Sequence, residues 1–237
     1  MSQAIRINVP GGVLQADLTV PVQARGLVIF CHGTGSDRRS PRNVRVAKVL
    51  QQAGIATLLV DMAPGDARSN PSANHQLERA RHNLLAVVDW TANQQDLSDL
   101  PLGLFGSSSG AAVALDVAAL RPDRILAIVS RGGRPDLAFE SLGMVRCPTL
   151  LIVGSADVDV LELNAWAAAH LRASHDLLVI AGASHLFAEP GALQQVAKAS
   201  CAWFERQLSR SELLQATSIH SPINSEKLQH AANQPCD

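Results

Sequence analysis

The pentapeptide Gly106-Ser107-Ser108-Ser109-Gly110 contains residue types that can present a nucleophile. It follows the apolar run Leu102 to Phe105 and precedes a helix-like stretch from Ala111 to Leu120. A sharp strand-to-helix turn pushes its central residue toward positive φ and exposes that side chain, and flanking glycines let the two backbones pass closely. We therefore expect Ser108 to be a nucleophile.

A serine hydroxyl is a weak nucleophile unless a base accepts its proton and a third group orients that base. Two further residues follow apolar runs: Asp157, in the segment Val153 to Asp157, and His185, in the segment Ala181 to His185. In an open parallel sheet, ligands bind beyond the carboxyl ends of the strands. The order Ser108, Asp157, His185 therefore predicts a catalytic triad at one edge of such a sheet, with Asp159 as the alternative acid.

The remaining histidines fit this geometry less well. His175 precedes its apolar run and should face away from the site, while His170 lies in a helical segment. His220 and His230 belong to a polar C-terminal stretch without strong periodicity. These positions favour His185 as the base.

The segment His32-Gly33-Thr34-Gly35 follows the apolar run Leu27 to Cys31. Backbone amides at such a position can form an oxyanion hole with the amide of the residue after the nucleophile. We predict the amides of Thr34 and Ser109 as the two donors, with Gly35 as the alternative to Thr34. His32 is expected to be structural.

The spacing of apolar residues predicts the elements that carry these side chains. Alternating polarity around Pro10-Gly11-Gly12 predicts an antiparallel hairpin at the exposed edge of a sheet, and short continuous apolar runs predict parallel strands covered on both faces. Helical segments between the runs indicate right-handed βαβ crossovers and a doubly wound α/β fold. The predicted hairpin strands are Ile5 to Val9 and Val13 to Leu18; the six runs are Leu27 to Cys31, Ile55 to Val60, Leu102 to Phe105, Ile125 to Val129, Thr149 to Val153 and Leu177 to Ile180; the helices are Asn43 to Ala53, His75 to Asn93, Ser109 to Leu120, Leu161 to Leu171 and Ala192 to Leu208.

The length of 237 residues suits a single α/β domain, which we place at residues 1–208. Residues 209–237 are polar and are expected to form a flexible or loosely docked tail. Only about 20 residues separate the runs that end near Val129 and begin near Thr149, which is too few for a large cap domain. The site should therefore be open.

Composition excludes several classes of function. A net charge of -1 with 17% charged residues argues against a nucleic-acid partner, and no apolar stretch reaches the roughly 20 residues that a membrane span needs. The four cysteines are far apart, and the first ten residues lack a signal-peptide core. We expect a cytoplasmic protein without metal or cofactor. The oligomeric state cannot be inferred from these features.

Several arginines follow strands at the predicted site edge. Arg38 and Arg42 follow one run, and Arg131 follows another. Guanidinium groups can hold the carboxylate or phosphate of an anionic substrate, and Arg131 is the best-placed candidate. Solvated loop charges and ion pairs, for example to Asp37 or Asp136, are an equal alternative.

Together these motifs resemble the α/β-hydrolase superfamily, and most closely its small, lidless dienelactone hydrolase-like branch. The resemblance spans about residues 5–208 and rests on the segments FCHGTGSDRRSPRN, LFGSSSG, VSRGGRPDL, LLIVGSADVDVLELN and GASHLFAEPGAL. It implies hydrolysis of an ester or lactone through an acyl-serine intermediate. Dienelactone hydrolases proper carry a cysteine at the position of Ser108, so the dienelactone substrate itself is not implied. Cys31 is expected to be a buried core thiol.

The sequence thus predicts a serine hydrolase of the carboxylesterase type acting on a small-molecule ester or lactone. An acyltransferase, a thioesterase or a peptidase could use the same triad, and these alternatives stay open. A hydrolase fold retained as a non-catalytic binding protein is an alternative from a different class.

Overall fold

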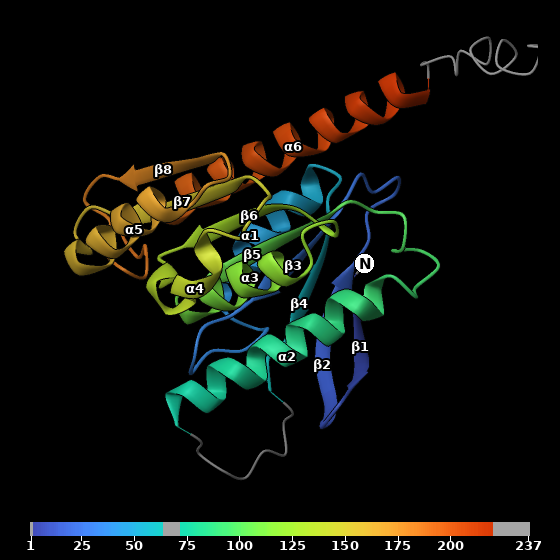
Figure 1. Cartoon of the computed structure of the whole chain (residues 1–237), viewed down its shortest axis with the longest axis horizontal. Coiled ribbons are helices and arrows are strands. Elements are labelled where there is room, and N and C mark those ends of the chain that lie inside the picture. Colours follow the sequence, from blue (N-terminus) through green and yellow to red (C-terminus); the bar gives the residue numbers. More distant parts are fainter. Residues whose placement is uncertain (1, 64–71, 220–237) are drawn as a thin grey trace, which may run out of the picture.

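The computed structural model describes residues 2–63 and 72–219, and within them a single sheet of eight strands (Figure 1). Its strand order is β1-β2-β4-β3-β5-β6-β7-β8, and β2 pairs antiparallel with both of its neighbours, β1 and β4. All pairings from β4 to β8 are parallel. The strands are β1 Ser2–Val9, β2 Gly12–Thr19, β3 Leu27–Cys31, β4 Ala56–Val60, β5 Leu102–Ser107, β6 Ile125–Arg131, β7 Thr149–Gly154 and β8 His175–Ile180. The fold is that of an α/β hydrolase, as predicted.

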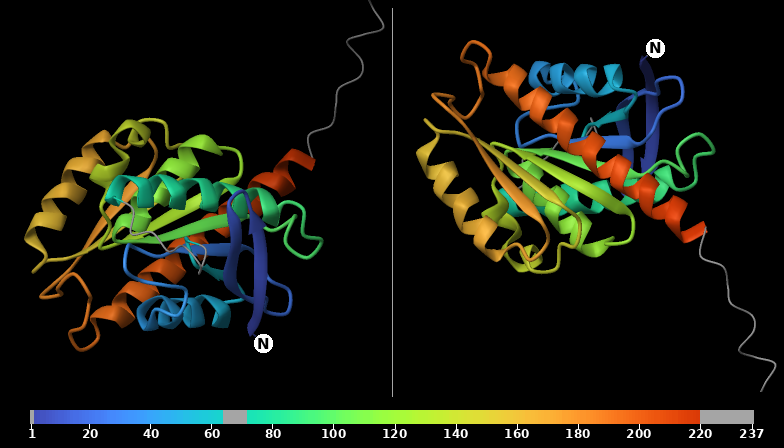
Figure 2. Two further views of the ribbon diagram at one scale, coloured as in Figure 1. Left: turned by 90° about the horizontal axis from the view of Figure 1, so that it is seen from below. Right: turned by 90° about the horizontal axis from the view of Figure 1, so that it is seen from above.

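Helices cover both faces of the sheet and create two hydrophobic cores (Figure 2). One core lies between the sheet and α2, α3 and α5; the other lies between the sheet and α1 and α6. Because β3 to β7 are buried on both faces, their residues are apolar almost without interruption. The helices are α1 Pro41–Gln52, α2 Ala73–Thr91, α3 Ser109–Leu120, α4 Phe139–Leu142, α5 Val158–His170 and α6 Ala192–Ile219.

Strand β8 differs from its prediction. The apolar run Leu177 to Ile180 was expected to be covered on both faces, but β8 is an edge strand in which Leu178 and Val179 are exposed. A short apolar run carries no information about whether a further strand or helix will cover it.

Helix α6 also extends further than its periodicity indicates. It continues past Leu208 to Ile219, and Arg25 donates hydrogen bonds to Ser209 and Glu212. The segment just beyond residue 208 is thus attached to the body of the protein, although α6 then projects beyond the sheet (Figure 1). The rest of the predicted tail, including His220 and His230, lies outside the described residues, and the domain boundary stays a prediction.

The connection between β6 and β7 contains no cap domain. It holds a short 3-10 turn, Pro135–Ala138, followed by the single-turn helix α4. Neither was predicted, because elements of four residues are too short to show a periodicity. None of the helices in residues 2–63 and 72–219 is both long and apolar enough to cross a membrane.

Substitution of Phe204 in α6 tests how much the core between the sheet and α6 contributes to stability. Its ring is 1% exposed and lies against Gly103 of β5, where an added Cβ would approach the ring to 2.6 Å. We expect Phe204→Ala to lower the free energy of unfolding by about 3–5 kcal/mol, measured by urea denaturation, because it leaves a cavity. The exposed Lys198 on the same helix is the control, and Lys198→Ala should change the free energy by less than about 0.5 kcal/mol.

Candidate active site

Ser108 lies in the turn between β5 and α3 with φ 51° and ψ −127°, a conformation that non-glycine residues rarely adopt. Its backbone is held from several sides. The Ser108 amide donates to the carbonyl of Arg131, and the Ser108 carbonyl accepts from the amides of Ala111 and Arg134. Neighbouring structure therefore maintains the strain at the predicted nucleophile.

The flanking glycines are required by close backbone approaches. A Cβ on Gly106 would collide with the backbone of Ala111, and one on Gly110 would collide with the carbonyl of Cys31. The backbone of Gly33 also lies close to the candidate nucleophile, because an added Cβ there would lie 2.9 Å from Ser108 Cβ. The GxSxG spacing thus has the steric reason expected from the sequence.

His185 and Asp157 meet at the ends of adjacent strands. His185 Nδ1 lies 2.7 Å from Asp157 Oδ2, within hydrogen-bond and ion-pair distance. Asp157 is the N-cap of α5, whereas the alternative acid, Asp159, lies two residues further on in the first turn of α5 and makes no described hydrogen bond to His185. The histidine side chain is 39% exposed and the aspartate side chain 16%, so the pair is open to solvent on the histidine side.

Backbone and side-chain hydrogen bonds join the two loops that carry this pair. The amides of Ser155 and Ala156 donate to the carbonyls of Ile180 and Ala183, and the Gly182 amide donates to Ser155 Oγ at 2.8 Å. These three hydrogen bonds fix the loops after β7 and β8 relative to each other. Sequence reasoning missed Ser155, although a serine directly after a buried strand is a common loop hydrogen-bonding residue.

Gly132 connects this unit with the Ser108 turn. It follows Arg131, whose carbonyl accepts from the Ser108 amide, and a Cβ on Gly132 would lie 3.5 Å from His185 Nδ1. The buried side-chain amide of Asn164 donates to the next carbonyl, that of Gly133, at 2.9 Å. Ser108, Asp157 and His185 thus surround one short segment after β6. The Ser108 hydroxyl itself makes no hydrogen bond to a described residue.

The segment predicted to form an oxyanion hole has an unexpected hydrogen bond. The Thr34 amide donates to Ser109 Oγ at 3.0 Å, and Thr34 Oγ1 lies 3.2 Å from the same oxygen. The Ser109 amide begins α3, where the first backbone donors lack partners within the helix. The Ser109 amide thus has no hydrogen-bond acceptor among the described residues, whereas the Thr34 amide already donates to the Ser109 side chain.

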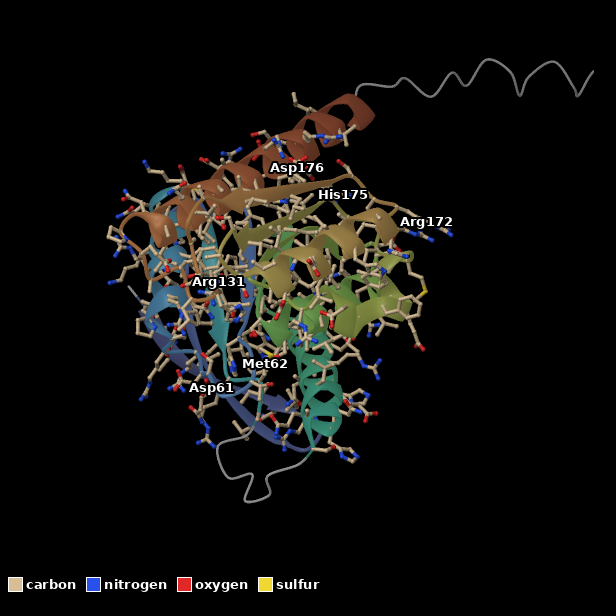
Figure 3. The ribbon with its side chains drawn as sticks, turned by 90° about the vertical axis from the view of Figure 1, so that its left-hand side faces the viewer. Asp61, Met62, Arg131, Arg172, His175 and Asp176 are labelled. Atoms are coloured by element: carbon tan, nitrogen blue, oxygen red, sulfur yellow. The ribbon has the colours of Figure 1, made fainter. Side chains whose placement is uncertain are left out.

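His32 is structural, as expected. Its Nε2 accepts from the Met62 amide at 3.0 Å, and Nδ1 lies 3.0 Å from the Gly33 carbonyl. Both contacts are satisfied when the neutral ring carries its proton on Nδ1. The ring joins the loop after β3 to the loop after β4, whose residues Asp61 and Met62 lie below Arg131 in Figure 3.

The predicted arginines fall into two groups. Arg38 pairs with Asp61 and Asp17, which matches the structural alternative. Arg131 is 7% exposed and has no carboxylate partner among the described residues. Burial, and then the charge of Arg42, lower the pKa of Arg131 to about 10. Arg131 therefore keeps its positive charge at neutral pH although no described carboxylate pairs with it.

A hollow of about 140 Å³ lies beside Thr34 and Ser109. It is bounded by the loops after β3 and β4 and by the facing sides of α2 and α3, including Leu77 and Val113. Arg79 also lines it, with a buried Nε that has no described partner. Sequence reasoning did not assign Arg79, because nothing in a helical pattern distinguishes one half-exposed arginine from another.

Cys31, the cysteine directly before the predicted oxyanion segment, is fully buried in β3. Burial raises the pKa of its thiol to about 12. The prediction of a core thiol is confirmed.

Comparison with known proteins is consistent with this geometry. The family model described as serine aminopeptidase, S33, matches residues 22–133. A dienelactone hydrolase from Anabaena variabilis is 43% identical and has a TM-score of 0.83, covering 87% of this chain and 97% of its own. A lidless α/β serine hydrolase from Xanthomonas campestris has a TM-score of 0.71 at 22% identity, covering 88% of this chain and 94% of its own, and supports the fold alone.

A curated relative from Mycobacterium tuberculosis, named as a candidate phosphoribosyl transferase, is 51% identical over 187 residues. The match covers 79% of this chain but only 42% of that protein. More than half of the relative therefore has no counterpart here. From its fold and its 43% identity to a structure that it covers almost completely, the chain belongs to the α/β-hydrolase superfamily, in the dienelactone hydrolase-like branch.

Proposed function

We propose that this protein hydrolyses a carboxylic ester or lactone of a small molecule through an acyl-Ser108 intermediate. The observation that carries the proposal is the 2.7 Å contact between His185 Nδ1 and Asp157 Oδ2 beside a serine held at positive φ. With Nδ1 donating to Asp157, the other ring nitrogen, Nε2, is free to accept a proton from Ser108.

In the first half of the reaction, Ser108 Oγ attacks the carbonyl carbon while its proton passes to His185 Nε2. The carbonyl oxygen becomes an oxyanion, for which we propose the amides of Thr34 and Ser109 as donors. Collapse of this intermediate breaks the bond to the alcohol oxygen, which takes the proton from His185. Asp157 stabilises the imidazolium and holds its orientation.

In the second half, His185 removes a proton from water, and the resulting hydroxide attacks the acyl carbon. The bond to Ser108 Oγ then breaks, and Oγ regains the proton from the imidazolium, which releases the carboxylic acid. The exposed side of His185 gives water direct access, which favours hydrolysis over transfer to another acceptor. Transfer, thioester cleavage and peptide cleavage remain alternatives for the same site, and cytoplasmic location remains a prediction.

Covalent labelling tests the nucleophile. We expect a fluorophosphonate probe to label Ser108, detected by peptide mass spectrometry, because an activated serine attacks phosphorus. Ser108→Ala should remove the label and lower nitrophenyl butyrate turnover by at least about 10³-fold. Ser107→Ala, at the neighbouring buried position, is the control for folding and accidental reaction. A folded protein with neither labelling nor turnover would support the binding-protein alternative.

Substitution of Ser109 tests whether its hydroxyl blocks the proposed oxyanion hole. Its hydroxyl occupies the Thr34 amide and must turn away before that amide can bind an oxyanion. We expect Ser109→Ala to retain or moderately raise kcat/KM for nitrophenyl esters, because the amide is then unoccupied. Steady-state kinetics on matched protein batches measure this. A loss of ten-fold or more would show instead that the hydroxyl itself donates to the oxyanion.

Alkylation of Cys31 tests whether this thiol, rather than Ser108, is the nucleophile. A pKa of about 12 rather than 9.0 lowers its thiolate fraction near pH 8 about a thousandfold. We expect iodoacetamide to leave Cys31 unmodified and activity intact in the native protein, with modification appearing only after unfolding. Rapid native alkylation of Cys31 with parallel loss of turnover would contradict a serine mechanism.

A further inference from the structure

Phe187, two residues after His185, has a backbone conformation that large side chains rarely adopt. Its φ is 54°, in the left-handed region where the Cβ of any residue other than glycine lies too close to the following carbonyl oxygen. The other described non-glycine residues at positive φ are Gln23, in an exposed turn, and Ser108, the candidate nucleophile. Strain retained at a residue so close to a reacting group points to a functional constraint.

The strained residue ends a tight turn that contains His185. The Phe187 amide donates to the Ser184 carbonyl at 3.0 Å, so His185 and Leu186 are the two central residues of the turn. Leu186 is exposed, whereas Phe187 is 1% exposed and belongs to the core between the sheet and α1 and α6. The turn therefore keeps the histidine at the edge of the sheet while the next ring but one is anchored in the core.

The Phe187 ring and His185 lie against the same residue, Gly132. A Cβ added to Gly132 would lie 3.4 Å from Phe187 Cε2, 3.5 Å from His185 Nδ1 and 3.3 Å from the His185 carbonyl oxygen. Gly132 itself has a φ of 50°, and its amide donates to the Ile152 carbonyl at 2.8 Å. Its bare backbone is thus a fixed surface on which both the histidine and the phenylalanine rest.

The segment that supports His185 also holds the Ser108 turn. The Ser108 amide donates to the Arg131 carbonyl, and the Arg134 amide donates to the Ser108 carbonyl. By contrast, the hydrogen bonds of the loop after β8 join it to the loop after β7. Those bonds orient the imidazole but do not fix its distance from Ser108. The packing of the His185 turn against Gly132 provides that connection.

We propose that Phe187 is a positioning residue, whose buried ring keeps the His185 turn against Gly132 and so holds the imidazole within reach of Ser108. The inference rests on the proposed ester hydrolysis and deepens it. Proton transfer needs the two heavy atoms within about 2.6–3.2 Å of each other, and a displacement of about 1 Å can lower a rate roughly 10²-fold. Because the ring is buried in the core, its loss should lower kcat and leave KM unchanged.

Steady-state kinetics with nitrophenyl butyrate test the proposal. We expect Phe187→Ala to lower kcat roughly 10- to 100-fold with KM within about two-fold of wild type. Phe187→Leu, which keeps most of the apolar volume, should recover kcat to within about five-fold of wild type. Phe204→Ala is the matched control, because Phe204 is equally buried in the same core but lies against Gly103, near the opposite end of β5 from the site. Its kcat should stay within about two-fold of wild type.

Phe187→Gly separates the ring from the strained backbone. Glycine adopts a φ of 54° without strain, so this variant should have a Tm equal to or above that of Phe187→Ala. Both variants lack the ring, and we expect both to have the same low kcat. A purely structural role predicts instead that activity follows stability, with the glycine variant the more active. Circular dichroism verifies that each variant is folded at the assay temperature, and the glycine variant also serves if the alanine variant does not fold.

The outcomes distinguish this proposal from the proposed function. If wild type is active and the folded variants without the ring keep kcat within two-fold, the positioning role of Phe187 is overturned while ester hydrolysis stands. A loss of activity that appears in KM alone, or an equal loss of kcat in Phe204→Ala, overturns it as well. If wild type hydrolyses no ester, the proposed function fails, and the role of Phe187 in proton transfer fails with it.

Discussion

Parallel pairing of β5, β6, β7 and β8 is the constraint on which the rest of this site depends. Each crossover helix returns the chain to the same end of the sheet, so every strand delivers its following residues to one edge. Ser108, Asp157 and His185 are separated by up to 77 positions in the chain, and only this repeated return brings them around the segment after β6. Strain at Ser108 is tolerated because two backbone hydrogen bonds, with Arg131 and Arg134, hold the turn from the segment after β6, and a third comes from α3.

Charge is distributed unevenly around that edge. Arg38 pairs with two carboxylates, Asp17 of β2 and Asp61 directly after β4, and so holds the loop after β3 in place. Arg131 and Arg42 have buried guanidinium nitrogens without such partners among the described residues, and Arg42 lines a cavity. Arginines that look alike along the chain therefore separate into structural and unpaired groups only when their neighbours are known.

The fold was predictable from the sequence because its signals are local, and the signal for the candidate nucleophile is local as well. Continuous apolar runs identify strands buried on both faces, and β3 has the predicted bounds; a serine between two glycines at a strand-to-helix junction has few other uses. Exposure of β8, the length of α6 and the short turns after β6 were not predictable from such patterns. Each depends on whether another part of the chain happens to lie alongside, and a local pattern does not contain that information.

By itself, the sequence determined the fold class of the chain and the strands after which Ser108, Asp157 and His185 lie, because periodicity and steric requirements are properties of neighbouring residues. The tertiary structure decided which aspartate meets His185, that the Thr34 amide is covered by Ser109 Oγ, and that Arg38 is paired whereas Arg131 is not. These are distances of a few ångströms between residues remote in the chain. They are set by loop conformation and side-chain packing, for which residue type and spacing provide no measure.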